Sequence, residues 1–297
     1  MTTAPIEKLE DFVSEILGRT TSATRLVSYR GHGNSAFKLQ PSIFRTAVNR
    51  ENEHILLREL VAAHPEDFSA DTSALELLVR MQHYSLPTRV LDVSLNPLVA
   101  LYFACEPTKK RVPAIRAGKR VLRSVEAEGE VVILSVSKRR VRYFDSDTVS
   151  ILANLARLRW DLQKKIDTGL EQEEFNKSLP IRRLVHFIRQ ESSGFEFGIE
   201  PSDLDDVLMV KPKQNNKRIL AQSGAFFVFG LTEELEDPNA LGVKIDRITI
   251  AAAAKKDIRD QLDKLAINEK TLFPEIERAA RYIAGTLTTP VSASKLI

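Results

Sequence analysis

Side chains able to bind ligands or catalyse reactions are concentrated at the ends of predicted helices and strands. Arg30 stands beside Gly31, just after a predicted strand at Arg25–Tyr29. A guanidinium in such a place can bind phosphate or carboxylate through two parallel hydrogen bonds. His83 falls in the last turn of a predicted helix, where the helix dipole favours a protonated imidazole. The polar residues placed in this way are Arg30, His32, Gln82, His83, Arg89, Asp92, Ser94, Asn96, Arg218 and Gln222.

Several of these residues also suit a purely structural role. Asn96 precedes Pro97, and both residue types are preferred at the start of a helix. An ion pair between Arg89 and Asp92 would fix the intervening turn without binding a ligand, because buried charges need partners. His83 is equally compatible with a structural histidine. The sequence leaves these alternatives open.

The stretch Leu75–Cys105 has to position many of these side chains. Ser73 and Glu76 have the spacing of a capping box, which predicts a helix that starts there and runs to about Tyr84. A proline then interrupts the helix, and Arg89–Asp92 has the pattern of a short buried strand. The last part of the stretch is apolar on every side, which indicates a helix in the core.

Predicted strands are scattered among helices without regular βαβ alternation, which indicates an α+β fold. We expect a central mixed or antiparallel sheet flanked by helices. No linker rich in Gly, Ser or Pro divides the chain, so residues 1–285 are predicted to form one domain and residues 286–297 a flexible tail. Residues 107–128 are basic and are predicted to be an insertion between core elements.

Charge is nearly balanced over the whole chain but not along it. The 43 basic and 40 acidic residues give a net charge of +3, which by itself indicates no polyanionic partner. Clustered Lys and Arg can nevertheless bind nucleic acid by releasing counterions from phosphates. Candidates for such contacts are Lys109, Lys110, Arg111, Arg120, Arg139 and Arg140. A solvated insertion with no partner is the alternative.

Several other classes of protein lack support in the sequence. No histidines are spaced i, i+4 and Cys105 is the only cysteine, so no metal site is predicted. A P-loop, a complete dinucleotide fingerprint and a nucleophile elbow are missing. The N-terminus lacks the pattern of a signal peptide, and no run of about 18 apolar residues could cross a bilayer. We therefore expect a cytoplasmic protein that does not enter membranes.

Motifs in order along the chain resemble the bacterial FRG domain, which is named for its aromatic-Arg-Gly motif. They are Tyr29-Arg30-Gly31, Leu39–Arg45, Gln82–Asp92, Asn96–Ala104, Arg218-Ile219, Gln222–Phe226 and Leu272-Phe273-Pro274. The resemblance extends over nearly the whole chain. Genes of this family often lie near mobile and phage-defence genes, so the resemblance implies a bacterial effector or toxin that acts in phage defence.

A more distant resemblance connects the chain to arginine-type ADP-ribosyltransferases. Arg30 on its predicted strand is similar to their first motif, in which the arginine holds the phosphate or ribose of NAD. Ser94, followed by the apolar segment Ala100–Ala104, is similar to the second motif. The third motif carries a catalytic glutamate, but Gln222-Ser223-Gly224 has none at the corresponding position. Glutamine cannot supply the charge that stabilises an oxocarbenium-like transition state.

The two resemblances imply an ADP-ribosyltransferase-like core with a nucleotide, NAD by expectation, in a central cleft. The expected catalytic residues are His83, Asp92 and Gln222. The expected cofactor-binding residues are Arg30, Gly31, Gln82, Arg89 and Ser94. Arg30 would hold phosphate, His83 would act as acid, base or hydrogen-bond donor, and Asp92 would supply the carboxylate. A non-catalytic module that binds nucleic acid or protein through residues 109–142 is the alternative.

Overall fold

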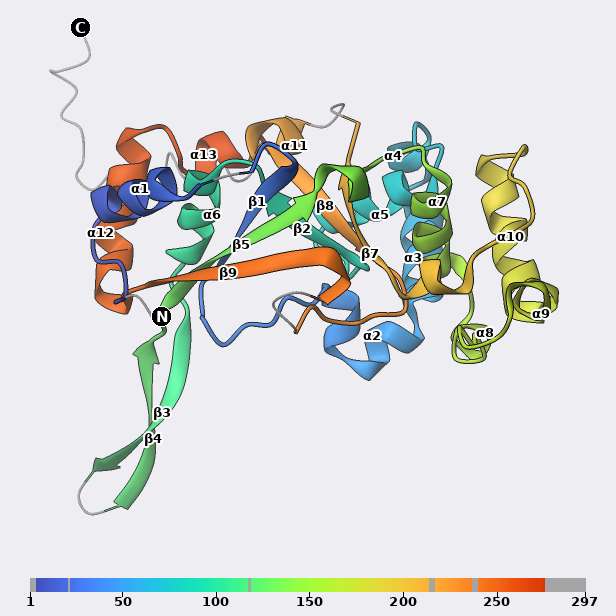
Figure 1. Cartoon of the computed structure of the whole chain (residues 1–297). Coiled ribbons are helices and arrows are strands. Elements are labelled where there is room, and N and C mark those ends of the chain that lie inside the picture. Colours follow the sequence, from blue (N-terminus) through green and yellow to red (C-terminus); the bar gives the residue numbers. More distant parts are fainter. Residues whose placement is uncertain (1–3, 21, 117–118, 214–216, 237–239, 276–297) are drawn as a thin grey trace, which may run out of the picture.

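The computed structural model describes residues 4–20, 22–116, 119–213, 217–236 and 240–275 (Figure 1). The strands are β1 (Arg25–His32), β2 (Val90–Ser94), β3 (Lys109–Arg116), β4 (Lys119–Glu126), β5 (Gly129–Ser137), β6 (Arg142–Tyr143), β7 (Val207–Lys211), β8 (Gly224–Phe229) and β9 (Val243–Ile250). The helices are α1 (Leu9–Gly18), α2 (Ala47–Glu51), α3 (Glu53–Ala63), α4 (Pro65–Phe68), α5 (Ala74–His83), α6 (Pro97–Ala104), α7 (Asp147–Asn154), α8 (Trp160–Gln163), α9 (Gln172–Lys177), α10 (Leu179–Glu191), α11 (Lys217–Ala221), α12 (Lys255–Lys264) and α13 (Glu269–Leu272). The predicted tail, residues 286–297, lies outside the described residues.

The described strands form one seven-stranded sheet in the order β6-β7-β8-β2-β1-β5-β9, and β3 and β4 form a separate two-stranded ribbon. Neighbouring strands of the sheet are antiparallel except β6 and β7, which are parallel. Helices lie at both ends of the sheet, with α1, α6 and α12 at one end and α5, α7 and α10 at the other (Figure 1). The predicted α+β fold with a mixed sheet flanked by helices is confirmed.

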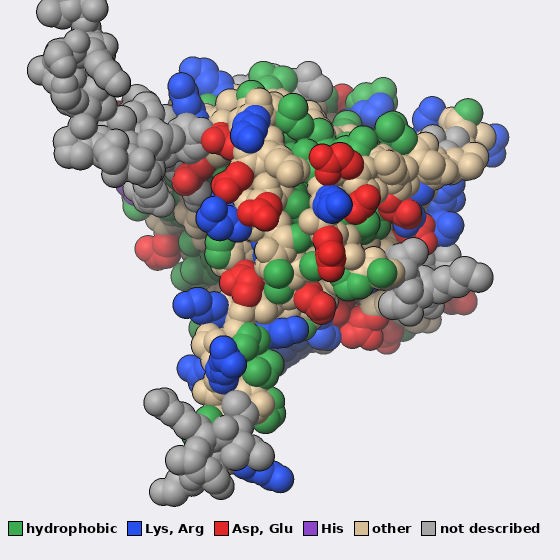
Figure 2. Space-filling model, turned by 90° about the vertical axis from the view of Figure 1, so that its left-hand side faces the viewer, with side chains coloured by type: hydrophobic (Ala, Val, Ile, Leu, Met, Phe, Trp, Pro, Cys, Tyr) green, Lys and Arg blue, Asp and Glu red, His purple; other side chains and the backbone are tan. Residues whose placement is uncertain are grey.

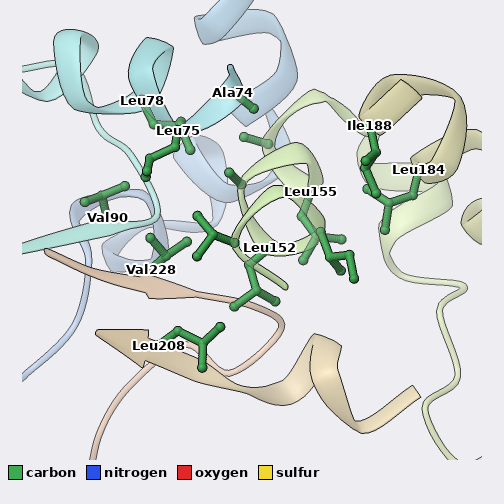
Figure 3. Close-up of a cluster of buried hydrophobic side chains, with 14 of the residues drawn as sticks. Ala74, Leu75, Leu78, Val90, Leu152, Leu155, Leu184, Ile188, Leu208 and Val228 are labelled. Atoms are coloured by element: carbon green, nitrogen blue, oxygen red, sulfur yellow. The ribbon is translucent and has the colours of Figure 1, made fainter. Parts of the chain in front are cut away.

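Apolar side chains pack against the sheet in three groups. The first joins α5, α7 and α10 to β2, β7 and β8, as the side chains of Leu78, Leu152 and Val228 show (Figure 3). The second joins α1, α6 and α12 to β5 and β9. The third group includes Leu91 of β2, next in sequence to Val90 of the first group, so it lies on the opposite face of the sheet. The helices of the first group and those of the second group therefore cover the same face of the sheet, as two separate sets.

The two helices around β2 begin largely as predicted. Ser73 caps α5 by accepting a hydrogen bond from the Glu76 main-chain nitrogen at 3.3 Å. The Glu76 carboxylate accepts instead from Thr72, at 2.8 Å from its nitrogen and 2.9 Å from its hydroxyl, so the reciprocal half of the capping box is replaced. Asn96 caps α6 by accepting from the Leu98 nitrogen at 2.9 Å. Side chains along α6 are buried, which confirms its predicted place in the core.

Strand β1 is longer than the sequence predicts. It pairs with β5 at every position from Arg25 to His32, so Arg30 lies inside the strand and not after its end. Gly31 allows this because α6 crosses the strand at its Cα. A Cβ there would lie 2.0 Å from the Ala100 carbonyl oxygen and 2.5 Å from the Ala104 nitrogen. The absence of a side chain is thus what lets the helix and the strand touch.

Among the described helices, none has both the length and the apolar character that spanning a membrane requires.

Candidate functional site

A pocket lies where β1 and β2 separate. The two strands are neighbours in the sheet but pair at a single position, Tyr29 with Ser94. The pocket encloses about 280 Å³. It is lined by Tyr29, Arg30, Gly31, His32, Gly33, Phe37, Arg45, Asp92, Val93, Ser94, Val99, Ala100, Phe103, Glu106, Arg218 and Gln222. Strand separation therefore brings residues from β1, β2 and α6 around one hollow.

Arg30 is held by two hydrogen bonds at the base of this hollow. Its Nη1 donates to the Asp92 main-chain oxygen at 2.5 Å, and its Nε donates to His32 Nε2 at 3.2 Å. Burial lowers the pKa of Arg30 to about 10, and this value still leaves the guanidinium charged at neutral pH. Arg30 thus contributes a fixed positive charge to the pocket.

Two further guanidinium groups line the same pocket. Arg45 ends a short 3-10 helix, η1 (Ser42–Arg45), and is exposed. Arg218 belongs to α11, and its guanidinium lies 4.8 Å from the centre of the Phe273 ring and 3.7 Å from the Glu275 carboxylate. With Arg30 they give the pocket three positive charges against the carboxylates of Asp92 and Glu106.

His83 borders a second hollow beside the first. This hollow is lined by His83 together with Asp92, Arg218 and Gln222, and the last three also line the main pocket. Burial, reinforced by the positive charge of Arg218, lowers the pKa of His83 below its ordinary value of 6.5. The imidazole is therefore neutral at pH 7, contrary to the protonated form that the sequence favours.

Asp92 presents its carboxylate between the two hollows. The side chain is half-buried, and its main chain pairs with Phe226 of β8. Within the part of the chain that the structure describes, the carboxylate has no hydrogen-bond or ion-pair partner. The ion pair between Asp92 and Arg89, an alternative that the sequence leaves open, is not formed, because Arg89 pairs with Glu53.

Gln222 and Ser94 close one side of the main pocket. The Ser94 hydroxyl donates to the Gln222 main-chain oxygen at 2.6 Å and accepts from the Asn96 nitrogen at 3.0 Å. The Gln222 amide donates to the Leu272 carbonyl at 3.0 Å. Both side chains line the pocket, and these bonds fix where β2 ends and where β8 begins.

Arg89 and Gln82 are not brought to the pocket. Arg89 is 1% exposed and binds both carboxylate oxygens of Glu53, with Nε 2.9 Å from Oε1. Its Nη1 donates to the main-chain oxygens of Phe229 at 3.2 Å and Gly230 at 3.0 Å. Gln82 accepts from the Thr88 hydroxyl at 2.5 Å. The structure thus places both residues in the framework that supports β2, where Arg89 is satisfied by protein partners and Gln82 is bonded to Thr88 through its side-chain oxygen.

The basic residues of the alternative site fall in two places. Lys109, Lys110, Arg111 and Arg120 lie on the β3–β4 ribbon. Arg139 and Arg140 lie in a 3-10 helix, η2 (Lys138–Arg140), which follows the far end of β5. Arg140 forms an ion pair with Asp206 at 2.8 Å. A strand of nine residues, about 30 Å long, separates the two groups, so they do not form one surface.

Phe37, Arg45 and Glu106 line the pocket but are not among the residues that the sequence singles out. Phe37 is 50% exposed, and its ring contacts His32 edge to face, with the two ring centres 6.2 Å apart. Arg45 stands within a motif of the resemblance, but nothing in its local sequence links it to Arg30. The path of residues 33–45 around the end of β1 brings Phe37 and Arg45 to the pocket, and Glu106 reaches it because it directly follows α6.

Comparison with known proteins gives one family. The model of the FRG domain matches residues 25–112, a segment that runs from β1 to the start of β3. No curated protein matches the chain, and no solved structure does. The matched segment contains Arg30, His83 and Asp92, whereas Arg218 and Gln222 lie beyond it. The match to the FRG domain therefore covers residues 25–112, and this segment carries most of the residues around the pocket.

Proposed function

We propose that the pocket between β1 and β2 binds a nucleotide, with NAD as the leading candidate. The observation that carries the proposal is the convergence of three positively charged side chains, Arg30, Arg45 and Arg218, on one hollow. Guanidinium groups suit phosphate because they offer planar pairs of N–H donors. A small pocket with this charge is suited to a phosphorylated ligand more than to a neutral metabolite.

Arg30 is the residue best prepared to hold phosphate. Two of its nitrogens are fixed by Asp92 and His32, so the side chain loses little conformational entropy on binding. Among the described residues its Nη2 has no hydrogen-bond partner, and Arg30 is one of the residues that line the pocket. Preorganised donors of this kind strengthen binding because the protein does not have to rearrange.

The rest of a nucleotide finds matching chemistry nearby. The half-exposed ring of Phe37 offers a face or edge for stacking a base. The Asp92 carboxylate can accept hydrogen bonds from ribose hydroxyls. The second hollow, which His83 borders, encloses only about 20 Å³, but it shares Asp92 and Arg218 with the first, so His83 lies beside the place that the ligand would occupy.

An ADP-ribosyltransferase-like reaction would use the same groups. In that reaction the bond between ribose and nicotinamide breaks, nicotinamide leaves with the bonding electrons, and an acceptor nucleophile attacks the sugar and loses its proton. Asp92 would stabilise the positive charge that develops on the ribose, because Gln222 has no charge to offer. A neutral His83 would accept the proton from the nucleophile.

Calorimetric titration of the purified chain with NAD, ADP and AMP tests the proposal. We expect binding by the unmodified protein and at least a tenfold loss of affinity in Arg30→Lys, because an ammonium cannot reproduce the fixed donor geometry of a guanidinium. Arg159→Lys, at an exposed arginine whose ion-pair partner is Asp161, is the matched control. The proposal is contradicted if none of the three ligands binds. It is also contradicted if Arg30→Lys and Arg159→Lys bind with equal affinity while both variants unfold at the same temperature as the parent protein.

A further inference from the structure

The β3–β4 ribbon projects from the body of the molecule. Its two strands pair with each other from Lys109–Glu126 at the root to Arg116–Lys119 near the tip and take no part in the large sheet. Eight residues per strand give the ribbon a length of roughly 27 Å. Figure 1 shows it extending away from the end of the sheet at which α6 and α12 lie.

Positive charge dominates this ribbon. Among residues whose side chains are described, Lys109, Lys110, Arg111, Arg120 and Arg123 are basic, and none of them forms an ion pair with another described residue. The acidic Glu126 lies at the root, where it pairs with the buried Lys255 at 3.2 Å. Lys and Arg side chains are visible along the projecting part in Figure 2. The charge is therefore available to a partner.

The register distributes these charges over both faces of the ribbon. Residues directly opposite each other share a face, and the faces alternate along each strand. Pairing of Arg111 with Ser124 and of Ile115 with Arg120 puts Lys109, Arg111 and Arg120 on one face. Pairing of Lys110 with Val125 and of Val112 with Arg123 puts Lys110 and Arg123 on the other. A partner that touches one flat face would use only part of this charge.

An isolated two-stranded ribbon is only marginally stable in water. Here it also leaves Leu122 65% exposed and Val121 38% exposed. The root is nevertheless firmly attached. The Lys255 ammonium donates to the Gly33 oxygen at 2.6 Å and the Glu106 oxygen at 3.2 Å, in addition to its ion pair with Glu126. The ribbon is thus anchored at its base and open to a partner along its length.

We propose that the β3–β4 ribbon is an arm that binds duplex DNA by lying in the major groove. That groove is about 12 Å wide and admits a two-stranded β-ribbon. Phosphates border it on both sides, which matches positive charge on both faces of the arm. The major groove of duplex RNA is deep and narrow and does not admit such a ribbon. The proposal is independent of nucleotide binding in the pocket.

Fluorescence anisotropy with a labelled DNA duplex of 20 base pairs, at 50 mM and 200 mM salt, tests the proposal on the full chain. One variant neutralises the first face with Lys109→Gln, Arg111→Gln and Arg120→Gln, and another neutralises the second face with Lys110→Gln and Arg123→Gln. The matched control is Arg159→Gln, Lys177→Gln and Lys256→Gln, which removes three exposed charges outside the ribbon. Thermal unfolding confirms that every variant is folded.

We expect the unmodified chain to bind duplex DNA and to bind it more weakly as salt increases. Each face variant should bind duplex DNA roughly tenfold more weakly than the parent. The slope of its log binding constant against log salt concentration should be shallower by about 0.9 for each phosphate that the arm no longer neutralises. The control should match the parent in both measurements. The proposal is overturned if duplex DNA does not bind, or if the control is weakened as much as the face variants. It is also overturned if only one face matters, or if single-stranded DNA or duplex RNA of equal length binds as tightly.

Discussion

The Arg30 guanidinium donates a hydrogen bond of 2.5 Å to the main-chain oxygen of Asp92, across the point where β1 and β2 separate. The two strands pair only at Tyr29 and Ser94, so no residue of β1 bonds to this oxygen through its main chain. A charged side chain replaces the strand partner that is missing. The sheet is thereby held together at the place where it opens into a pocket, and the side chain that holds it also lines the pocket.

Gly31 should not tolerate a side chain. A Cβ at this position would lie 2.0 Å from the main chain of α6, so Gly31→Ala requires the helix to move away from β1. We expect the variant to be destabilised by at least about 2 kcal/mol, in the range seen for overpacked cores. Urea unfolding measures the effect. Gly18→Ala is the control, because a Cβ at the end of α1 meets nothing within 4 Å and should be neutral or slightly stabilising. Equal stabilities of the two variants would contradict the close approach of α6 to β1.

Arg89 and Glu53 should behave as a coupled pair. Glu53→Leu alone leaves a buried guanidinium without its anion and should lower the free energy of unfolding by about 3–5 kcal/mol. Arg89→Met should also be destabilising, since the Phe229 and Gly230 oxygens lose their donor. The double variant should be more stable than the sum of the two effects predicts, with a coupling energy of about 1–3 kcal/mol.

A double-mutant cycle measured by urea unfolding gives this coupling. The exposed pair of Lys177 and Glu173 is the control, for which we expect less than about 1 kcal/mol. A coupling no larger than that of the control would show that Arg89 does not depend on Glu53.

His32 should make stability depend on pH. Burial lowers the pKa of His32 below 6.5, the Glu130 carboxylate opposes the decrease, and the positive charge of Arg30 adds to it. Its Nε2 accepts from Arg30, and its Nδ1 lies 3.8 Å from Glu130, whose carboxylate binds Arg247 at 2.5 Å. Between the lowered pKa and pH 6.5 the unfolded chain binds more protons than the folded chain. The contribution of His32 is therefore fully present above pH 6.5 and is lost as the pH decreases below it.

Urea unfolding of the parent and of His32→Gln at pH 7.5, 6.5 and 5.5 measures this contribution. Other titrating groups, including His83, are common to both proteins and cancel in the difference. We expect the advantage of the parent over the variant to shrink as the pH decreases from 6.5 to 5.5. A difference that stays constant across these pH values would show that His32 titrates alike in the folded and unfolded chains.

Local patterns are sufficient to predict the elements around the pocket. Ser73 and Asn96 are predicted as helix caps and cap α5 and α6, because capping bonds join residues two or three positions apart. The apolar character of α6 predicts its burial for a similar reason, since it depends only on the residues of the helix itself. Arg30 and Asp92 are predicted to lie near each other through a resemblance, and the structure brings them to one pocket.

Which charges meet is decided by the tertiary structure alone. Arg89 pairs with Glu53, which is 36 residues away in the sequence, and not with Asp92, which is three residues away. The reason is that Arg89 directly precedes β2 and its side chain meets α3, whereas Asp92 lies within β2 beside the pocket. Arg45 and Arg218 reach Arg30 only through the path of the chain after β1 and the placement of α11 beside β8. Arg139 and Arg140 continue the basic pattern in sequence, yet β5 carries them away from the ribbon.

The sequence by itself determined helices, strands, caps and the kinds of residue near the site, since these depend on neighbours along the chain. Partners, pocket and arm were decided by sheet order and strand separation, which join residues that are far apart in sequence.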